Sequence, residues 1–191
     1  TAGSRRSVRN NFIIAMSINA DLSRANDLFK QKKYVQAASL FEAIADAYQD
    51  LNEVLKSTEM KNNASVAYLM AGDPQKSYEL SKDTHLFFEE TKDWKNYGLA
   101  IGNQASALEN LGKKDQALEF FQIAADKLKM AGEKESRAYV LKRISALQIQ
   151  RGEQLDALGS MTAALQNLPK LSRREKILKK LTDLVMKIGT R

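Results

Sequence analysis

The chain has 191 residues, a formal net charge of +7, 43% hydrophobic and 28% charged residues, and no cysteine. The absence of cysteine excludes disulfides, thiolate nucleophiles and thiolate metal sites, and a single histidine excludes any site that needs two imidazoles from this chain. No apolar run approaches the roughly 20 residues that span a bilayer. This composition predicts one ordinary domain or a short repeat array with an apolar core.

The positive charge lies at the two ends of the sequence. Residues 1–11 contain three arginines and no acidic residue, and residues 170–191 contain eight basic and two acidic residues. Residues 12–169 therefore carry a net charge of −2. Because a nucleic-acid-binding protein usually spreads positive charge along its binding face, this distribution argues against nucleic acid as the partner.

Residues 1–16 are predicted to form a leader outside the repeats. The leader contains the apolar cluster Phe12 to Met16, and the chain starts at Thr1 rather than at a methionine. Two interpretations are open: part of the leader is vector-derived or disordered, or it is the remainder of a preceding element. If it is native, we expect the cluster to pack on the first helices of a monomer or on a second copy in a dimer.

The segment 17–169 contains a repeat of roughly 40-residue length. Gly72, Gly112 and Gly152 are equally spaced, and each separates two stretches of helical apolar periodicity. The same step back from Gly72 reaches Lys32, between two further stretches. Small residues recur seven positions before each turn and five positions after it. We expect small residues of one helix to face large residues of the next, which allows close packing. The predicted repeats are 17–53, 54–92, 93–132 and 133–169.

Each repeat is predicted to be a hairpin of two helices. The first helices are expected over 17–31, 55–71, 94–111 and 134–151, and the second over 34–50, 74–91, 114–131 and 154–167. Asp73 and Pro74 are a good start signal, since aspartate caps a helix and proline suits its first turn. Gly132 and Pro169 mark breaks. No breaker occurs in residues 54–60, which leaves the boundary between the first two hairpins least defined.

A ninth helix is predicted over 172–188, within a basic amphipathic segment at 170–191. Its apolar residues recur at helical spacing and form a stripe: Ile177, Leu178, Leu181, Leu184, Val185 and Ile188. Most lysines of the segment fall off this stripe. We expect this capping helix to cover the last hydrophobic surface of the array.

The repeats resemble the tetratricopeptide repeat family. The family's repeat pattern, which has a glycine in the turn and small residues at fixed places, is matched best by Gly112, Ala117, Phe121 and Ala124, and next by Gly152, Ala157, Met161 and Ala164. Residues 132–139 are similar to the inter-repeat loop of the roughly 40-residue variant found in Pins-type adaptors and kinesin light chains. The period differs from the family's usual one of about 34 residues, and the first repeat lacks the turn glycine. The resemblance implies an all-α fold: a right-handed superhelical solenoid of four helical hairpins plus a C-terminal capping helix.

A candidate binding surface follows from the repeat and the resemblance together. In the family, the first helices of the hairpins line a concave face, and positions i, i+3 and i+7 share one side of each helix. The candidate peptide-binding residues are Asn26, Lys30, Asn63, Met70, Asn103, Asn110, Arg143 and Gln150. An amide offers donors and acceptors, so it can hold an extended peptide backbone, whereas Arg143 can bind a carboxylate. Asn63 and Asn103 match the asparagine that family members use for this contact. The alternative is that the stripe is simply a solvated helix face.

The remaining polar and glycine residues predict structural roles. His85 lies inside a predicted helix, Trp94 with Tyr97 is interpreted as a packing anchor between repeats, and Gly98 and Gly102 are expected to allow close approach of a neighbouring backbone. No catalytic constellation, zinc spacing or phosphate-binding glycine loop is found in the sequence.

We therefore expect a non-enzymatic, intracellular, cytoplasmic adaptor that binds a protein or peptide, with an organelle interior also open. We expect no cofactor, metal or small-molecule substrate. The alternative is docking to a membrane surface or a nucleic acid through the basic ends.

Overall fold

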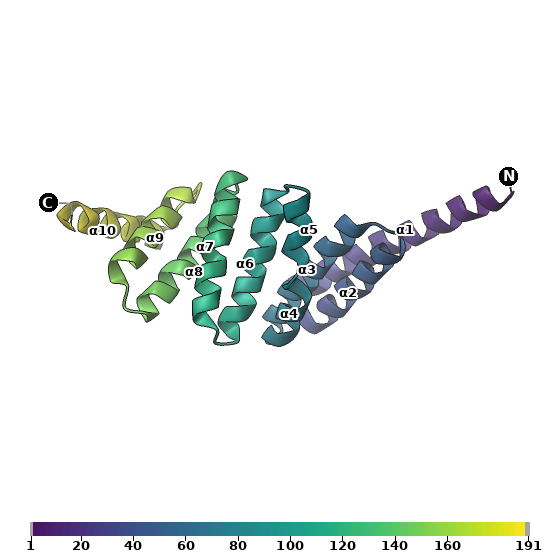
Figure 1. Ribbon diagram of the computed structural model, residues 1–191, viewed down its shortest axis with the longest axis horizontal. Coiled ribbons are helices and arrows are strands. Elements are labelled where there is room, and N and C mark those ends of the chain that lie inside the picture. The colour runs from purple at the N-terminus through teal and green to yellow at the C-terminus, as the bar shows by residue number, and fades with distance from the viewer. Residues whose placement is uncertain (1, 190–191) are drawn as a thin grey trace. The chain divides into compact units, whose positions relative to one another are not determined.

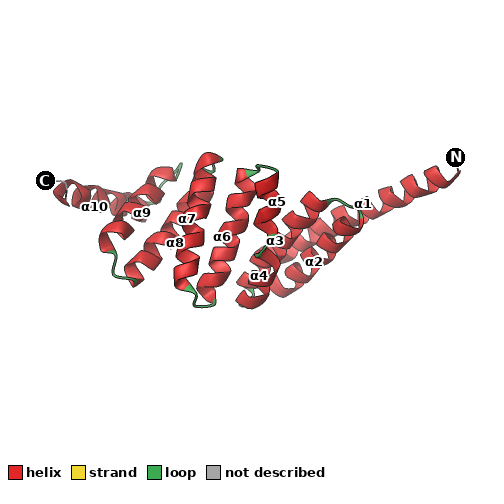
Figure 2. Ribbon diagram, in the orientation of Figure 1, coloured by secondary structure: helices red, strands yellow, loops and turns green. Residues whose placement is uncertain are grey.

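The structure is a computed structural model that describes the backbone of residues 2–189 and the side chains of residues 16–185 and 187. The regular elements of this part of the chain are α-helices joined by short turns (Figure 2). The helices are α1 (Ala2–Lys30), α2 (Tyr34–Asp50), α3 (Val54–Met70), α4 (Pro74–Ser81), α5 (Thr84–Glu90), α6 (Trp94–Asn110), α7 (Lys114–Met130), α8 (Lys134–Gln150), α9 (Gln154–Asn167) and α10 (Arg173–Gly189). Among the described residues, none of the helices has both the length and the apolar character needed to cross a membrane.

The chain divides after Thr84 into two compact units. In the first unit, α1 packs on α2, α2 on α3, and α3 on α4. In the second unit, α6 packs on α7, α7 on α8, α8 on α9, and α9 on α10, and Figure 1 shows α6 to α9 side by side in chain order. Neighbours in the sequence are thus neighbours in space within each unit, as in a helical repeat.

The turns that end the helices recur at half of the repeat period, so each repeat contains two of them. At each turn one residue adopts a left-handed conformation, with φ between 56° and 86°: Lys32, Asn52, Gly72, Lys92, Gly112, Gly132 and Gly152. The amide that follows each of them donates to the carbonyl five residues earlier, for example Glu53 N to Tyr48 O at 2.9 Å. This bond closes a Schellman motif and satisfies a free carbonyl at the helix end. Asn52 supplies the boundary between α2 and α3 for which the sequence showed no breaker.

Two predicted helix boundaries are wrong. α1 begins at Ala2 instead of residue 17, so its backbone runs without a break through most of the predicted leader. The predicted packing of the Phe12 to Met16 cluster falls outside the described side chains, except for Met16, which is exposed.

The second difference is that the helix predicted over 74–91 is interrupted between α4 and α5. Ser81 Oγ donates to the carbonyl of Ser77 at 2.9 Å, and Thr84 Oγ1 donates to the carbonyl of Ser81 at 2.9 Å and lies 3.1 Å from Asn62 Oδ1. All four side chains are buried. Hydroxyls that bond to nearby carbonyls bend helices, and here they accompany the break.

Small residues bring the two helices of a pair together. The column seven positions before the turn is fully buried in every repeat: Ala25, Ser65, Ala105 and Ser145. Ser65 Oγ donates to the carbonyl of Ser77 at 2.9 Å, and Ser145 Oγ donates to that of Ala157 at 2.7 Å. Both acceptors belong to the small column five positions after the turn. The expectation that small residues face large ones is therefore wrong here: the two small columns face each other.

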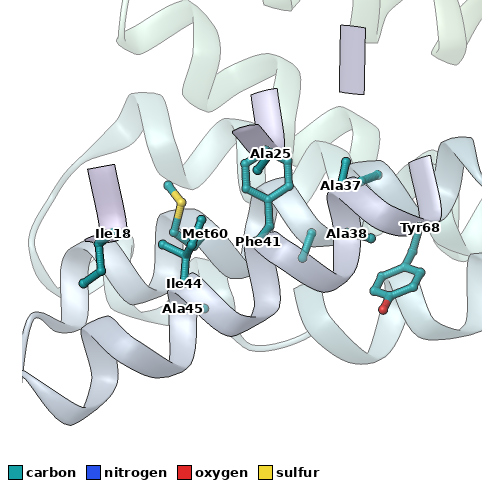
Figure 3. Close-up of a cluster of buried hydrophobic side chains, with 11 residues drawn as sticks. Ile18, Ala25, Ala37, Ala38, Phe41, Ile44, Ala45, Met60 and Tyr68 are labelled. Carbon is teal, nitrogen blue, oxygen red and sulfur yellow. The ribbon is translucent and has the colours of Figure 1, made fainter. Parts of the chain in front are cut away.

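The core of the first unit lies between α1, α2 and α3 (Figure 3). Its labelled side chains are Ile18, Ala25, Ala37, Ala38, Phe41, Ile44, Ala45, Met60 and Tyr68. The hydroxyl of Tyr68 donates to Glu42 and lies 2.6 Å from Lys76 Nζ, which is 3.2 Å from Glu42. The hydrogen bond to Tyr68, and to a smaller extent that to Glu42, raises the pKa of Lys76. This polar cluster ties α2, α3 and α4 together at the edge of the core.

Close packing of α6 on α7 depends on Gly98. A Cβ at Gly98 would lie 2.7 Å from Leu128 Cγ and 3.2 Å from the backbone nitrogen of Leu128. At Gly102 the nearest atom would be 3.7 Å away, which is an ordinary contact. The expected close approach is confirmed at Gly98, and at Gly102 it is wrong.

Candidate functional site

Half of the predicted binding residues lie in the first unit. They are all exposed: Asn26 and Lys30 on α1, and Asn63 and Met70 on α3. Lys30 Nζ lies 3.6 Å from the carboxylate of Asp27, and Asn63 Nδ2 lies 4.0 Å from the sulfur of Met60. These weak contacts within one helix leave the four side chains accessible to a partner.

The other half lies in the second unit. These residues are Asn103 and Asn110 on α6, and Arg143 and Gln150 on α8. Asn110 and Gln150 are exposed, whereas Asn103 and Arg143 are half-buried. Asn110 Nδ2 donates to the carbonyl of Ser106 at 2.9 Å, which fixes the orientation of the amide at the end of α6.

Arg143 is engaged within the protein, where its guanidinium binds a carboxylate of the same chain, and its binding of a ligand carboxylate stays a prediction. Its Nη2 lies 2.5 Å from Glu109 Oε1, and its Nε donates to Glu109 Oε2 at 3.0 Å. This two-point hydrogen bond raises the pKa of Arg143. Because Glu109 is on α6 and Arg143 on α8, the pair also shows that the two helices lie next to each other in the second unit.

Tyr139 belongs to the same surface and was missed. It is 56% exposed and lies one helical turn before Arg143, so the two share a side of α8. The signal was available, because Tyr139 stands four residues before a residue of the predicted stripe. Tyrosine provides a large apolar contact area and a hydroxyl, as binding surfaces often require.

An ion pair ties α10 to α8. Lys142 Nζ lies 2.6 Å from Glu175 Oε1. Glu175 also accepts from the amide of Ser172 at 2.9 Å, while Ser172 Oγ accepts from the amide of Glu175 at 3.3 Å, which forms a capping box at the start of α10. The bond from Lys142, followed by those from Ser172, lowers the pKa of Glu175 to about 2. In the second unit, the ion pairs thus place α8 between α6 and α10.

The apolar stripe of α10 faces solvent, which overturns the expectation that it covers the array. Its described residues are between 37% and 61% exposed: Ile177, Leu178, Leu181, Leu184 and Val185. Thr182, in contrast, is 3% exposed. Glu175 lies on the opposite side of the helix from Leu184, nine residues later. Its bond to Lys142 therefore turns the polar side of α10 toward the protein.

The aromatic residues that open α6 are packed. Trp94 and Tyr97 rings lie 6.1 Å apart, and Lys127 Nζ of α7 lies 4.0 Å from the centre of the Trp94 ring and 5.0 Å from that of Tyr97. The ring of His85 lies 5.8 Å from that of Tyr97. Burial raises the pKa of Tyr97. The prediction of a packing anchor is confirmed, and the anchor joins α5, α6 and α7.

Two other kinds of functional site are a metal centre and a hollow that could hold a ligand. The described side chains include no group of three or more His, Asp or Glu residues that could hold a metal ion. An open hollow of about 460 Å³ lies between α1 and α2 and is lined by Arg24, Leu28, Val35, Gln36, Ser39 and Leu40. None of the predicted binding residues lines this hollow.

The sequence matches no protein-family model and no curated protein. Membership of the tetratricopeptide repeat family therefore stays a proposal that depends on the residues and their spacing.

Proposed function

We propose that this chain is a non-enzymatic scaffold of the tetratricopeptide type, and that it binds a segment of another protein along its first helices. The observation that supports this function is the recurrence of accessible amide side chains at equivalent positions. Asn110 and Gln150 stand one repeat period apart, and both are exposed at the ends of α6 and α8. Arg143 and Glu109 hold these two helices side by side.

The chemistry of this surface suits an extended peptide. Each amide can donate to a backbone carbonyl and accept from a backbone amide, so it binds a segment largely independently of its side chains. Tyr139 in the second unit and Met70 in the first are exposed and can add apolar contact. The Arg143–Glu109 pair holds α6 and α8 together and leaves the amides of Asn110 and Gln150 exposed.

A pull-down from native cells with two double variants tests this proposal. Asn63→Ala with Asn103→Ala removes one amide from each unit. We expect recovery of the partner to fall about 10-fold, because each lost hydrogen bond contributes roughly 0.5–1.5 kcal/mol. The matched control is Gln36→Ala with Gln116→Ala, which removes exposed amides from equivalent positions on second helices. Retention of every partner by the first variant would contradict the proposal.

The alternative function is docking to an anionic surface through the basic ends. One observation favours it: the exposed charged residues on the described part of α10 are all cationic. Such binding to anionic vesicles or RNA would weaken steeply between low and physiological salt. Binding that is absent, or that does not respond to salt, would remove this alternative.

A further inference from the structure

α10 has the length and spacing of a first helix of the repeat. α3, α6 and α8 each contain 17 residues and begin at Val54, Trp94 and Lys134. α10 also contains 17 residues and begins at Arg173, which is one position short of a full repeat period after the start of α8. By position, α10 is the first helix of a further pair.

The exposed stripe of α10 corresponds to a buried face of α8. Leu141 and Ile144, which stand one period before Leu181 and Leu184, are buried. Ser145, one period before Val185, is also buried and donates to a carbonyl of α9. In α8, this face includes Ser145, whose bond ties it to the second helix of its own pair, on which α8 packs. In α10 the equivalent face is apolar throughout its described residues and exposed.

Two residues of α9 are likewise more exposed than the residues of α7 that stand one repeat period earlier. Leu118 and Phe121 of α7 are buried. The residues one period later, Leu158 and Met161 of α9, are only half-buried. Both helices at the C-terminal side of the second unit therefore present residues that the preceding pair buries. Their equivalence to buried positions indicates that a helix is the element that fits this surface.

The charges of α10 indicate the chemistry of that helix. Its exposed charged residues in the described part of the chain are Arg173, Arg174, Lys176, Lys180 and Lys187. Glu175 and Asp183 are half-buried, and Glu175 is bound to Lys142. An occupant with acidic residues along one edge complements this surface, whereas a second copy of α10 would bring like charges together.

We infer that the exposed face of α10, together with Leu158 and Met161, is a docking site for an amphipathic helix of another protein. This helix has an apolar stripe and acidic residues along one edge, and it lies against α10 as α9 lies against α8. The inference rests on the proposed protein-binding function but uses a surface separate from the amide stripe. Leu181 and Leu184 lie at the centre of the contact.

The binding test uses a labelled peptide that copies α7, residues 114–130, because α7 packs on a first helix. The peptide carries Lys127→Glu. In the protein Lys127 contacts Trp94, and Arg174 stands two repeat periods after Trp94. A glutamate at this position of the peptide would therefore face a cation. Fluorescence anisotropy with the full chain is expected to show saturable binding.

The variants separate the docking site from other surfaces. Leu181→Glu with Leu184→Glu is expected to weaken peptide binding about 100-fold, since two leucines that the bound peptide would cover are lost. Both side chains are exposed, and far-UV circular dichroism checks that the fold persists. The matched control is Leu155→Glu, because Leu155 is 81% exposed at a position that is exposed in every repeat. Arg174→Glu is expected to weaken binding of this peptide and to strengthen binding of the peptide with Lys127 retained.

The results that would overturn the inference are distinct from those that would overturn the proposed function. Asn63→Ala with Asn103→Ala is expected to bind the peptide as the unchanged chain does. The inference fails if the double glutamate variant binds the peptide equally well, or if no saturable binding occurs up to about 100 µM, which is far weaker than a specific interface. It also fails if the stripe instead mediates self-association, measured by light scattering, or binds phosphatidylserine vesicles while the peptide does not bind.

Discussion

The two glycines inside α6 should respond in opposite ways to the same substitution. Gly98 and Gly102 lie one turn apart in the same helix, so alanine removes the same backbone entropy from the unfolded state at each position. The difference lies in the space available. A methyl group at Gly98 would meet Leu128 at both its Cγ and its backbone nitrogen, at 2.7 and 3.2 Å, whereas a methyl group at Gly102 would meet nothing closer than 3.7 Å.

These distances set the expected changes in the free energy of unfolding. In a helix interior, alanine is about 0.8–1.0 kcal/mol more favourable than glycine. Overpacking at a close contact costs about 1–3 kcal/mol, and the backbone of α7 cannot rotate away as a side chain can. Gly98→Ala is therefore expected to destabilise the protein by about 1 kcal/mol, and Gly102→Ala to stabilise it by about 0.5–1 kcal/mol.

Urea unfolding followed by circular dichroism measures both changes. The control is Gly159→Ala in α9, where an added Cβ would meet nothing within 4 Å. It reports the gain in helix propensity without any packing term, although α9 is a different helix. A Gly98→Ala protein as stable as the control variant would refute the packing argument. So would a Gly102→Ala protein less stable than the unchanged chain.

Three further predictions concern polar contacts. The pKa of Glu175 is about 2, below its ordinary value of 4.5, so its stabilising bond to Lys142 is fully present above about pH 5 and is lost as the pH falls toward 2. Lys142→Met should raise the pKa of Glu175 measured by NMR toward the ordinary value, while the remaining bonds with Ser172 keep it below that value, and an unchanged pKa would contradict this. Arg143→Met and Glu109→Gln should show a coupling of about 1 kcal/mol in a double-mutant cycle of stability, because the pair is bidentate and partly buried; additive effects would show that the pair contributes nothing. Thr84→Val should cost roughly 1–2 kcal/mol, because it removes a buried hydroxyl that bonds to α3 and to the end of α4, and unchanged thermal stability would exclude that role.

Most helix ends could be predicted because the turns repeat. Glycine adopts the left-handed conformation without strain, so Gly72, Gly112 and Gly152 marked three turns directly. Lys32, one period before Gly72, and Asn52, half a period before it, adopt the same conformation, although lysine carries no local signal for it. There the hydrogen bond to the carbonyl five residues earlier and the packing of the flanking helices determine the turn. The period could locate Lys32 from Gly72, Gly112 and Gly152, whereas the column of Asn52 holds Lys92 one period later and a glycine, Gly132, only two periods later.

The features that could not be predicted from the sequence depend on contacts between residues that are far apart in it. The exposed amides followed from the period, since a residue on one side of a helix reappears there one repeat later. The separation of Glu109 and Arg143 in the sequence is not a multiple of the repeat, and their bond became visible only when α6 and α8 were placed side by side. The break between α4 and α5 likewise depends on Thr84 reaching Asn62 on another helix.

α10 shows the limit of hydrophobic periodicity most directly. The spacing of its leucines correctly predicts an amphipathic helix, because it depends only on the geometry of α10 itself. Which side of that helix meets the protein depends on Lys142, Ser172 and Glu175, whose bonds orient the polar side inward. An apolar stripe therefore identifies the face that a helix can bury. It does not identify the element that covers this face. The equivalence of this stripe to the buried face of α8 is what makes a partner helix the expected neighbour.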